Sequence, residues 1–362
     1  MGRRKRNQRV LVSMSGGLDS TMAAVLLKED GWEVIGAHMQ LYDVDRVRPS
    51  GCCSPKDAED AGTMARLMGI PFHIFDFRDA FTREVIVPFV ESYRCGRTPN
   101  PCVLCNDRMK FRLLRSRALE LGAPYIATGH YARIGHCPDR GRHLLLKGVD
   151  RRKDQSYFLF TLTQDQAGST LFPLGGRTKE GVRAKARQMG LPVWEKDESQ
   201  EICFIPDADY RIFVDDMAGG SARPGQIVDL EGNVLGCHQG ISRFTVGQRR
   251  GLGIASNEPY YVVRLEEDSN RVVVGCRGNL SHSGLLASGV NWIAGSPPEV
   301  SEKVMVKIRY RSKEISAILE SVNGCATRVR FVKPAGAVTP GQAAVFYRGD
   351  EVLGGGWIEQ GL

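Results

Sequence analysis

The segment Ser-Gly-Gly-Leu-Asp-Ser at positions 15–20 limits the possible folds more than any other part of this sequence. The apolar run 10–14 before it is predicted to be a strand, and the periodic residues 21–29 after it a helix. Two glycines permit a tight turn in which backbone N–H groups converge at a helix N-terminus, where negative charge is favoured. The segment is therefore predicted to bind phosphate, although it lacks the Gly-Lys-Ser/Thr ending of a Walker A loop.

Strand-like and helix-like segments alternate through the first half of the chain. Strands are predicted at 33–41, 72–77 and 125–128, and helices at 55–68, 80–93 and 109–121. This alternation is typical of an α/β fold with a parallel sheet covered on both faces. Ligands of such sheets bind at the carboxyl ends of the strands.

The pattern changes near Asp207, where Gly, Pro and Asn begin to separate short alternating runs. These runs predict an all-β half with strands at 225–230, 260–265, 271–274, 303–310, 317–322, 327–331 and 343–347. We expect two small domains there, divided within residues 281–286.

Composition excludes several classes of protein. With 42% hydrophobic and 25% charged residues, the chain has the profile of a soluble globular protein, and no apolar run approaches the roughly 18 to 20 residues of a membrane helix. The basic residues 3–9 lead directly into the first strand, so a secretion signal is not expected. The formal net charge of +8 suits a polyanionic partner, or serves solubility alone. Ten scattered cysteines predict reduced thiols and a cytoplasmic protein.

Two of these cysteines lie in Thr-Pro-Asn-Pro-Cys-Val-Leu-Cys-Asn at 98–106, which we interpret as a proline-stiffened loop just before the helix 109–121. A thiolate near a helix N-terminus is stabilised, so Cys102 and Cys105 are candidates for sulfur chemistry. The alternatives are half of a zinc site, a thioredoxin-like pair or inert thiols. Zinc would need two more ligands, and no second C-x-x-C exists; the phosphate loop at the first strand–helix turn disfavours a thioredoxin fold.

A further cysteine, Cys203, lies in Ser-Gln-Glu-Ile-Cys-Phe-Ile-Pro at 199–206. Taken alone, it would be interpreted as a buried structural thiol. Together with the phosphate loop and the pair Cys102 and Cys105, it indicates a sulfurtransferase.

These motifs resemble the tRNA-specific 2-thiouridylase family (MnmA type) of the ATP-pyrophosphatase, or PP-loop, superfamily. Further matching segments are Cys-Cys-Ser at 52–54, Ala-Thr-Gly-His-Tyr at 127–131, Lys-Asp-Gln-Ser-Tyr at 153–157, Phe-Thr-Val-Gly-Gln-Arg-Arg-Gly-Leu at 244–252, Arg-Tyr-Arg at 309–311, Gly-Gln-Ala-Ala-Val-Phe-Tyr at 341–347 and three glycines at 354–356. The resemblance therefore runs nearly end to end.

The resemblance implies three domains and one reaction. Residues 1–206 would form a parallel-sheet PP-loop adenylation domain with the catalytic cysteines, 207–281 a β-rich central domain, and 282–362 a C-terminal β-barrel that contacts tRNA. With Mg²⁺, ATP would adenylate the C2 carbonyl oxygen of the wobble uridine and release pyrophosphate. Sulfur from a cysteine persulfide would then replace that oxygen and release AMP. A sulfur-donor protein or a sulfide source would be the second partner.

The resemblance also implies roles for individual residues. Cys203 would carry the persulfide, and Cys105 would attack it and end in a disulfide with Cys203. Expected ATP contacts are Ser13, Met14, Ser15, Gly16, Gly17, Leu18, Asp19, Ser20, Met39 and Gly129. Asn100, Pro101 and Cys102 would meet the target base, and His130, Lys153, Asp154, Gln155, Arg309, Tyr310 and Gln342 would contact tRNA.

Cys102 departs from the family pattern, because many members carry aspartate there as a proposed general acid or base. A thiol with a tuned pKa can also move a proton. It adds a third soft ligand, so Cys102, Cys105 and Cys203 could instead hold a [4Fe-4S] cluster by three irons, and cluster-bound sulfide would then attack the base. Both sulfur routes stay open at the level of sequence.

Two rival functions differ from a 2-thiouridylase. A non-catalytic tRNA-binding or sulfur-carrier protein would not need the intact loop 15–20 together with Cys105 and Cys203. Another adenylating enzyme of the superfamily would lack that pair of cysteines, or would carry additional domains.

Overall fold

The computed structural model describes residues 8–42, 55–196, 202–205, 209–220, 223–299, 301–323 and 326–362. The chain divides into two compact units. The first comprises Met1–Val85, Cys102–Ala208 and Asp350–Val352, and the second comprises Ile86–Pro101, Asp209–Gly349 and Leu353–Leu362. Each unit is described separately.

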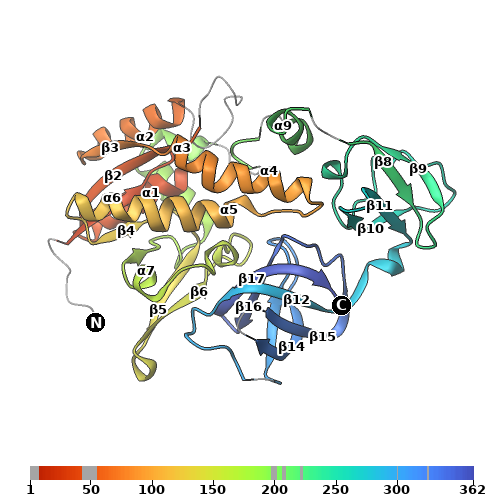
Figure 1. Cartoon of the computed structure of the whole chain (residues 1–362). Helices are drawn as coiled ribbons and strands as arrows, with labels where there is room; N and C mark the ends of the chain where they lie inside the picture. Colours follow the sequence, from red (N-terminus) through yellow and green to blue (C-terminus); the bar gives the residue numbers. More distant parts are fainter. Residues whose placement is uncertain are drawn as a thin grey trace. The chain divides into compact units, whose positions relative to one another are not determined.

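A five-stranded parallel sheet forms the centre of the first unit (Figure 1). Its strands are β1 (Arg9–Ser13), β2 (Glu33–Gln40), β3 (Phe72–Asp76), β4 (Tyr125–Ala127) and β7 (Thr170–Leu171), in the order β3-β2-β1-β4-β7. Val10, Leu11 and Val12 of β1 have no exposed surface. Because successive strand residues point to opposite faces, both faces of the sheet are covered at β1. The predicted α/β fold with a parallel sheet is confirmed.

Helices and one hairpin complete the first unit. α1 (Leu18–Glu29), α2 (Pro55–Met68) and α8 (Lys179–Gln188) share an apolar core with β1 and β2. The shorter elements are α3 (Arg78–Phe81), which runs into a π-helical turn (Thr82–Ile86), α7 (Gln164–Gly168), and the antiparallel strands β5 (Ala132–Cys137) and β6 (Arg142–Lys147). The start of β17 (Glu351–Gly361) pairs with β6 through Glu351 and Val352.

The helix that carries Cys102 and Cys105 begins earlier than predicted. α5 (Pro101–Leu104), a π-helical segment (Cys105–Leu114) and α6 (Arg115–Glu120) follow one another without a break. The predicted start at residue 109 was therefore wrong, and the two cysteines lie in the first turns of the helix instead of in a loop before it. Proline is tolerated at the first helical position because its missing N–H has no partner there in any helix.

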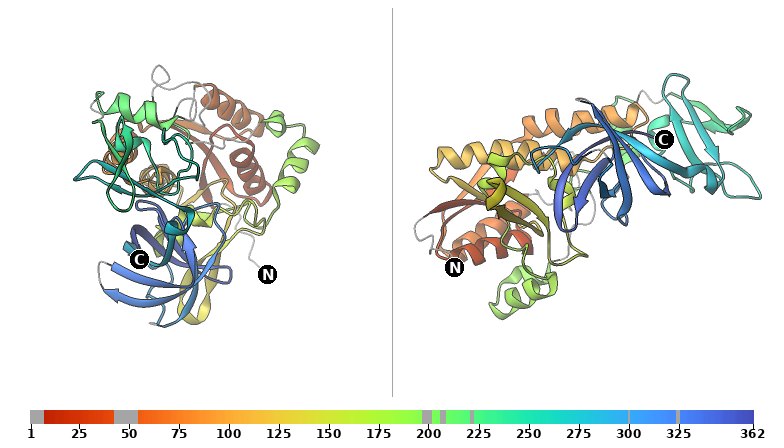
Figure 2. Two further views of the ribbon diagram at one scale, coloured as in Figure 1. Left: turned by 90° about the vertical axis from the view of Figure 1, so that its right-hand side faces the viewer. Right: turned by 90° about the horizontal axis from the view of Figure 1, so that it is seen from below.

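The second unit contains two β structures. Four strands, β8 (Gly225–Val228), β9 (Val234–His238), β10 (Tyr261–Glu266) and β11 (Arg271–Gly275), form a sheet in the order β10-β11-β8-β9. Six further strands are β12 (Ser281–Asn291), β13 (Lys303–Lys307), β14 (Ile315–Asn323), β15 (Ala326–Gly336), β16 (Ala343–Arg348) and β17 (Glu351–Gly361). They follow the order β12-β15-β14-β13-β16-β17, and β12 also pairs with β17, so this sheet closes into a barrel (blue in Figure 2).

The prediction of an all-β second half was wrong, because α9 (Tyr210–Met217) precedes its first strand. The second unit also contains α4 (Val87–Arg94), which comes from the first half of the chain. Each predicted strand of this half overlaps an observed one. The predicted central β-rich domain and C-terminal barrel are confirmed as architecture. The boundaries at 206/207 and 281/282 stay predictions.

Candidate active site

The turn between β1 and α1 folds around the side chain of Ser20. Its Oγ accepts a hydrogen bond from Ser15 N (3.1 Å), lies 3.2 Å from Ser15 Oγ and donates to Gly17 O (3.2 Å). Gly16 has a φ of +74°, and a Cβ there would lie 2.4 Å from the carbonyl oxygen of Asp57, so the position requires glycine. Gly17 is the N-cap of α1, which places the loop N–H groups where anions are favoured.

The loop lies at the topological switch point of the sheet. β2 and β4 both pair with β1, and the chain passes from β3 on one side to β4 on the other. Gly129 follows β4, and a Cβ on it would lie 2.7 Å from the carbonyl carbon of Asp19 and 2.8 Å from Ser20 N. The structure therefore brings Gly129 against the loop, and its contact with ATP stays a prediction. Four further expected nucleotide contacts are buried: Ser13, Met14, Leu18 and Met39.

A lysine that sequence reasoning missed lies beside this loop. Lys179 Nζ is 2.8 Å from both carboxylate oxygens of Asp19, and the Tyr131 hydroxyl donates to Asp19 Oδ1 at 2.9 Å. The Lys179 side chain is only 10% exposed, against 33% for Asp19. Lys179 is also the first residue of α8, where the helix dipole disfavours a cation. A residue that breaks a local rule in this way is typical of a functional site.

A second cation connects the loop to α2. Lys196 Nζ donates to the carbonyl oxygen of Gly16 (3.1 Å) and pairs with Asp57 (3.3 Å) and Asp60 (2.5 Å). Burial opposes its charge, but the hydrogen bonds and charges of Asp60 and Asp57 outweigh that effect and raise the pKa of Lys196. Lys196 therefore stays protonated and holds the loop backbone to the start of α2.

His130 is a buried, uncharged ring. Its Nδ1 lies 2.6 Å from Thr128 Oγ1, and the ring packs between Phe111 and Phe172. Burial, together with the nearby charge of Lys110, lowers the pKa of His130 well below its usual value. The imidazole is therefore neutral at physiological pH, and its predicted contact with tRNA stays a prediction.

The Lys-Asp-Gln segment is tied to the same region. Gln155 Oε1 accepts from Tyr131 N (3.0 Å), and Gln155 N donates to Tyr131 O (3.0 Å). The buried Asp154 carboxylate accepts hydrogen bonds from Gly148 N and from Ser156 N and Oγ. Through Tyr131, which also contacts Asp19, the segment is joined to the nucleotide loop.

Cys102 is exposed and Cys105 is partly buried, three positions further along the same helix. Cys102 lies in the first turn of this helix, and Cys105 begins the π-helical segment that follows. The next residue, Asn106, donates to the carbonyl of Phe158 (3.3 Å) and accepts from Lys110 (2.9 Å), which fixes this part of the helix.

Cys203 is partly buried, and its neighbour Phe204 anchors the segment in the first unit. The Phe204 ring packs edge-on against Phe81 of α3, with centroids 5.5 Å apart. α3 in turn contacts the π-helical segment that begins with Cys105. Residues 199–201 and 206 of the Cys203 motif, and the predicted motif at 52–54, lie outside the described residues.

The three cysteines do not form a ligand set for a cluster as they are placed. Among the residues that the structure describes, no three His, Cys, Asp or Glu side chains gather closely enough to hold a metal ion. A [4Fe-4S] cluster bound through three irons needs three thiolates around it. The arrangement does not fit such a cluster, and no step is derived through one.

The predicted target-base residues Asn100 and Pro101 are buried in the second unit. The loop before them is held by Gln342, whose Nε2 donates to the carbonyl oxygens of Thr98 (3.0 Å) and Pro99 (3.1 Å). Gln342, which was predicted to contact tRNA, thus holds this loop within the chain.

The other two predicted tRNA residues of this unit lie after β13. The Arg309 guanidinium donates to the carbonyl oxygens of Val246 (3.2 Å) and Ala337 (3.1 Å). The ammonium of Lys307 lies over the Tyr310 ring, 5.7 Å from its centroid. Their contacts with tRNA stay predictions.

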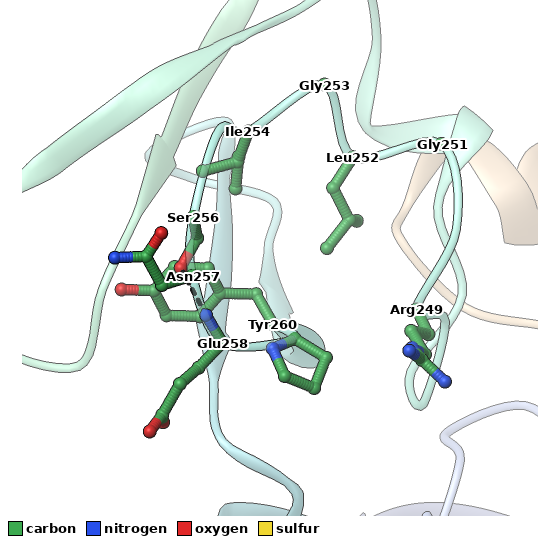
Figure 3. Close-up of a pocket in the computed structure, with 10 residues that line it drawn as sticks. Arg249, Gly251, Leu252, Gly253, Ile254, Ser256, Asn257, Glu258 and Tyr260 are labelled. Atoms are coloured by element: carbon green, nitrogen blue, oxygen red, sulfur yellow. Dashed lines mark hydrogen bonds between the residues drawn. The ribbon is translucent and has the colours of Figure 1, made fainter.

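A pocket of about 400 Å³ lies in the β-rich sheet region, lined by residues between Arg249 and Tyr260. Figure 3 shows Leu252 and Ile254 between Arg249 and Asn257. None of the predicted site residues lines this pocket.

Comparison with known families agrees with the architecture. Residues 8–207 match the family described as "tRNA methyl transferase HUP domain", 212–276 the "tRNA methyl transferase PRC-barrel domain", and 282–358 the "Aminomethyltransferase beta-barrel domain". A glycine loop at the switch point of a parallel sheet, followed by these two β domains, defines a PP-loop protein of the tRNA-modifying type.

Curated relatives narrow this class. Proteins named "tRNA-specific 2-thiouridylase MnmA" are 51% identical in Geobacter metallireducens, over 99% of this chain and 98% of the relative, and 50% identical in Geotalea uraniireducens, over 100% and 98%. The protein of this name from Carboxydothermus hydrogenoformans is 47% identical, over 100% of this chain and 99% of the relative. The chain belongs to the tRNA-specific 2-thiouridylase family. Within its described residues, no helix is long and apolar enough to cross a membrane.

Proposed function

We propose that this chain is an ATP-dependent tRNA-uridine 2-sulfurtransferase that acts on the wobble uridine in the cytoplasm. The observation that carries the proposal is the nucleotide loop with Gly129, Asp19 and Lys179 around it, in a chain about half identical to 2-thiouridylases along its whole length. An amide-like oxygen is a poor leaving group, so its replacement by sulfur requires activation by ATP.

The loop would bind the ATP phosphates through its N–H groups and the hydroxyls of Ser15 and Ser20. Lys179 is the cation placed to meet a phosphate when Asp19 is engaged by Mg²⁺, for which carboxylate oxygens are suitable ligands. Magnesium would supply charge neutralisation. The uridine C2 oxygen attacks the α-phosphorus, the bond to the bridging oxygen breaks, and pyrophosphate leaves.

Sulfur would be delivered by Cys203 and Cys105. A sulfur-donor protein first loads Cys203 with a persulfide, whose terminal sulfur attacks C2 of the adenylated base. The Cys105 thiolate then attacks Cys203 Sγ, the S–S bond breaks with its electron pair left on the transferred sulfur, and AMP leaves with the former carbonyl oxygen. The resulting Cys105–Cys203 disulfide must be reduced by an external thiol before the next turnover.

Target-base binding is assigned to Asn100, Pro101 and Cys102, with Cys102 as the group that moves a proton at the uridine. The wider tRNA surface would include His130, Lys153, Asp154, Gln155, Arg309, Tyr310 and Gln342. Arginine and lysine at such positions bind phosphate, and tyrosine can stack on an unpaired base.

The test is thiolation of unmodified tRNA with ATP, a sulfur-donor protein that carries a persulfide, and a thiol that reduces the Cys105–Cys203 disulfide, measured by retardation of thiolated tRNA in a mercury-containing gel. Pyrophosphate release is followed separately. The Cys203→Ser variant should release pyrophosphate but fail to thiolate tRNA. The control variant Cys237→Ser, which changes an exposed thiol on β9, should release pyrophosphate and also thiolate tRNA. Absence of thiolated tRNA with wild-type protein, or transfer of a methyl group instead, would overturn the proposal.

A further inference from the structure

The loop 97–99, which precedes the target-base residues, is held by the turn between β15 and β16 of the barrel in its own unit. Both backbone hydrogen-bonding groups of Thr98 are used. Its N–H donates to Pro340 O (2.9 Å), and its carbonyl accepts from Gln342 Nε2 (3.0 Å). Between these two contacts stands Gly341, with a φ of +89°, where a Cβ would lie 2.9 Å from the Thr98 carbonyl oxygen. This close approach of two backbones requires glycine.

Gln342 is the donor on which the loop depends. Pro99 and Pro101 have no N–H group, so few backbone donors are present to hold the turn. Thr98 is half-buried and Pro99 is buried, so their carbonyl groups need hydrogen-bond donors within the protein. One side-chain amide serves both, at 3.0 and 3.1 Å.

Two further contacts hold the same loop. Arg97 pairs with Glu359 of β17 at 2.6 Å, and the Glu359 carboxylate also accepts from Ser288 of β12. Thr98 Oγ1 lies 3.5 Å from Thr245 Oγ1. Three successive loop residues, 97–99, are thus bound by side chains or backbone of the barrel.

We propose that Gln342 is a positioning residue that sets the geometry of the target-base loop, residues 97–99, and thereby of residues 100–102 after it. The barrel would then control the rate of base activation, in addition to any contact that it makes with tRNA. This inference rests on the proposed function, because it assigns residues 100–102, which follow the loop 97–99, to the target base. A misplacement of about 1 Å at a reacting group can cost about 100-fold in rate. Gln342 therefore acts on the reaction through the loop.

The test compares Gln342→Ala and Gln342→Glu with Gln360→Ala, which removes an exposed amide from β17 of the same barrel. Glutamate has the shape of glutamine but cannot donate to two carbonyl oxygens. We expect kcat for tRNA-dependent pyrophosphate release to fall about 10- to 100-fold in both Gln342 variants. Loss of any contact between Gln342 and tRNA would show separately, as weaker tRNA affinity by filter binding. Gln360→Ala should behave as wild type.

Hydrogen–deuterium exchange supplies a readout that does not depend on activity. Exchange at the amides of Arg97, Thr98 and Asn100 should accelerate in the Gln342 variants without nucleotide or tRNA, and the melting temperature should confirm that the barrel is folded. Unchanged kcat with weakened tRNA binding, or wild-type exchange in this loop, would refute the inference. A wild-type protein that modifies no tRNA would refute the proposed function instead, while the exchange result would still report on the loop.

Discussion

Replacing Lys179 by methionine removes one charge of a largely buried ion pair and keeps the length of the side chain. Loss of one partner of a fully buried pair costs about 3–5 kcal/mol, and loss of an exposed pair about 0–1 kcal/mol. Here the lysine is 10% exposed and Asp19 33%, so Asp19 stays partly hydrated. The Tyr131 hydroxyl also continues to donate to it.

The expected loss is therefore about 2 kcal/mol, between the two limits. Relief of the unfavourable position of a cation at the start of α8 reduces it by a few tenths of a kcal/mol. Lys185→Met is the matched control, since Lys185 lies on the same helix as Lys179. Its ion pair with Glu29 of α1 is more exposed, with side chains 31% and 45% exposed. That change should cost less than about 1 kcal/mol.

Urea denaturation followed by circular dichroism compares the two variants, and a thermal shift with ATP and Mg²⁺ tests the nucleotide role. A lost charge-assisted contact with phosphate, worth about 1.5–3 kcal/mol, should weaken ATP binding about 10- to 100-fold in Lys179→Met only. Equal denaturation midpoints for both variants would refute the burial reasoning. An ATP-induced shift equal to that of wild type would show that Lys179 serves structure alone.

Two further predictions concern the same unit. Gly129→Ala should abolish ATP-induced stabilisation, because its Cβ would lie 2.7–2.8 Å from the backbone of Asp19 and Ser20. Gly176→Ala is the control, since a Cβ there would have no atom within 4 Å, and it should leave the ATP-induced thermal shift unchanged. Equal thermal shifts in the two variants would contradict the packing argument. Burial lowers the pKa of His130, so as pH falls below about 6.5 the unfolded chain binds a proton that the folded chain does not, and stability should decrease by up to about 1.4 kcal/mol per pH unit. Unfolding of His130→Asn should depend less on pH between 7 and 5, and an equally steep dependence would contradict the assignment.

Features of the site that depend on local sequence were predictable. The loop at 15–20 has its glycines, hydroxyls and flanking elements within a few residues, and the structure confirms its strand–loop–helix setting. The helix 55–68 was predicted with its observed bounds, because its periodicity and acidic first turns are local signals. The parallel sheet followed from the alternation of such elements.

Features that depend on distant partners were not predictable in this way. Nothing near Lys179 reveals that its partner is Asp19, 160 positions earlier. The helix start at Pro101 was missed because proline commonly marks a loop, although the first helical position accepts it. The contacts of Gln342 with residues 98 and 99 also cross more than two hundred positions, and only the fold brings them together.

The tie between the target-base loop and the barrel has a consequence for synthesis of the chain. Residues 97–99 leave the ribosome early, yet their partners Gln342 and Glu359 follow 244 and 262 positions later. Contacts of such long range form late, whereas the nucleotide loop has most of its partners within the first unit. Under the proposed function, a nascent chain acquires its ATP site well before the residues that would hold the uridine are fixed in place.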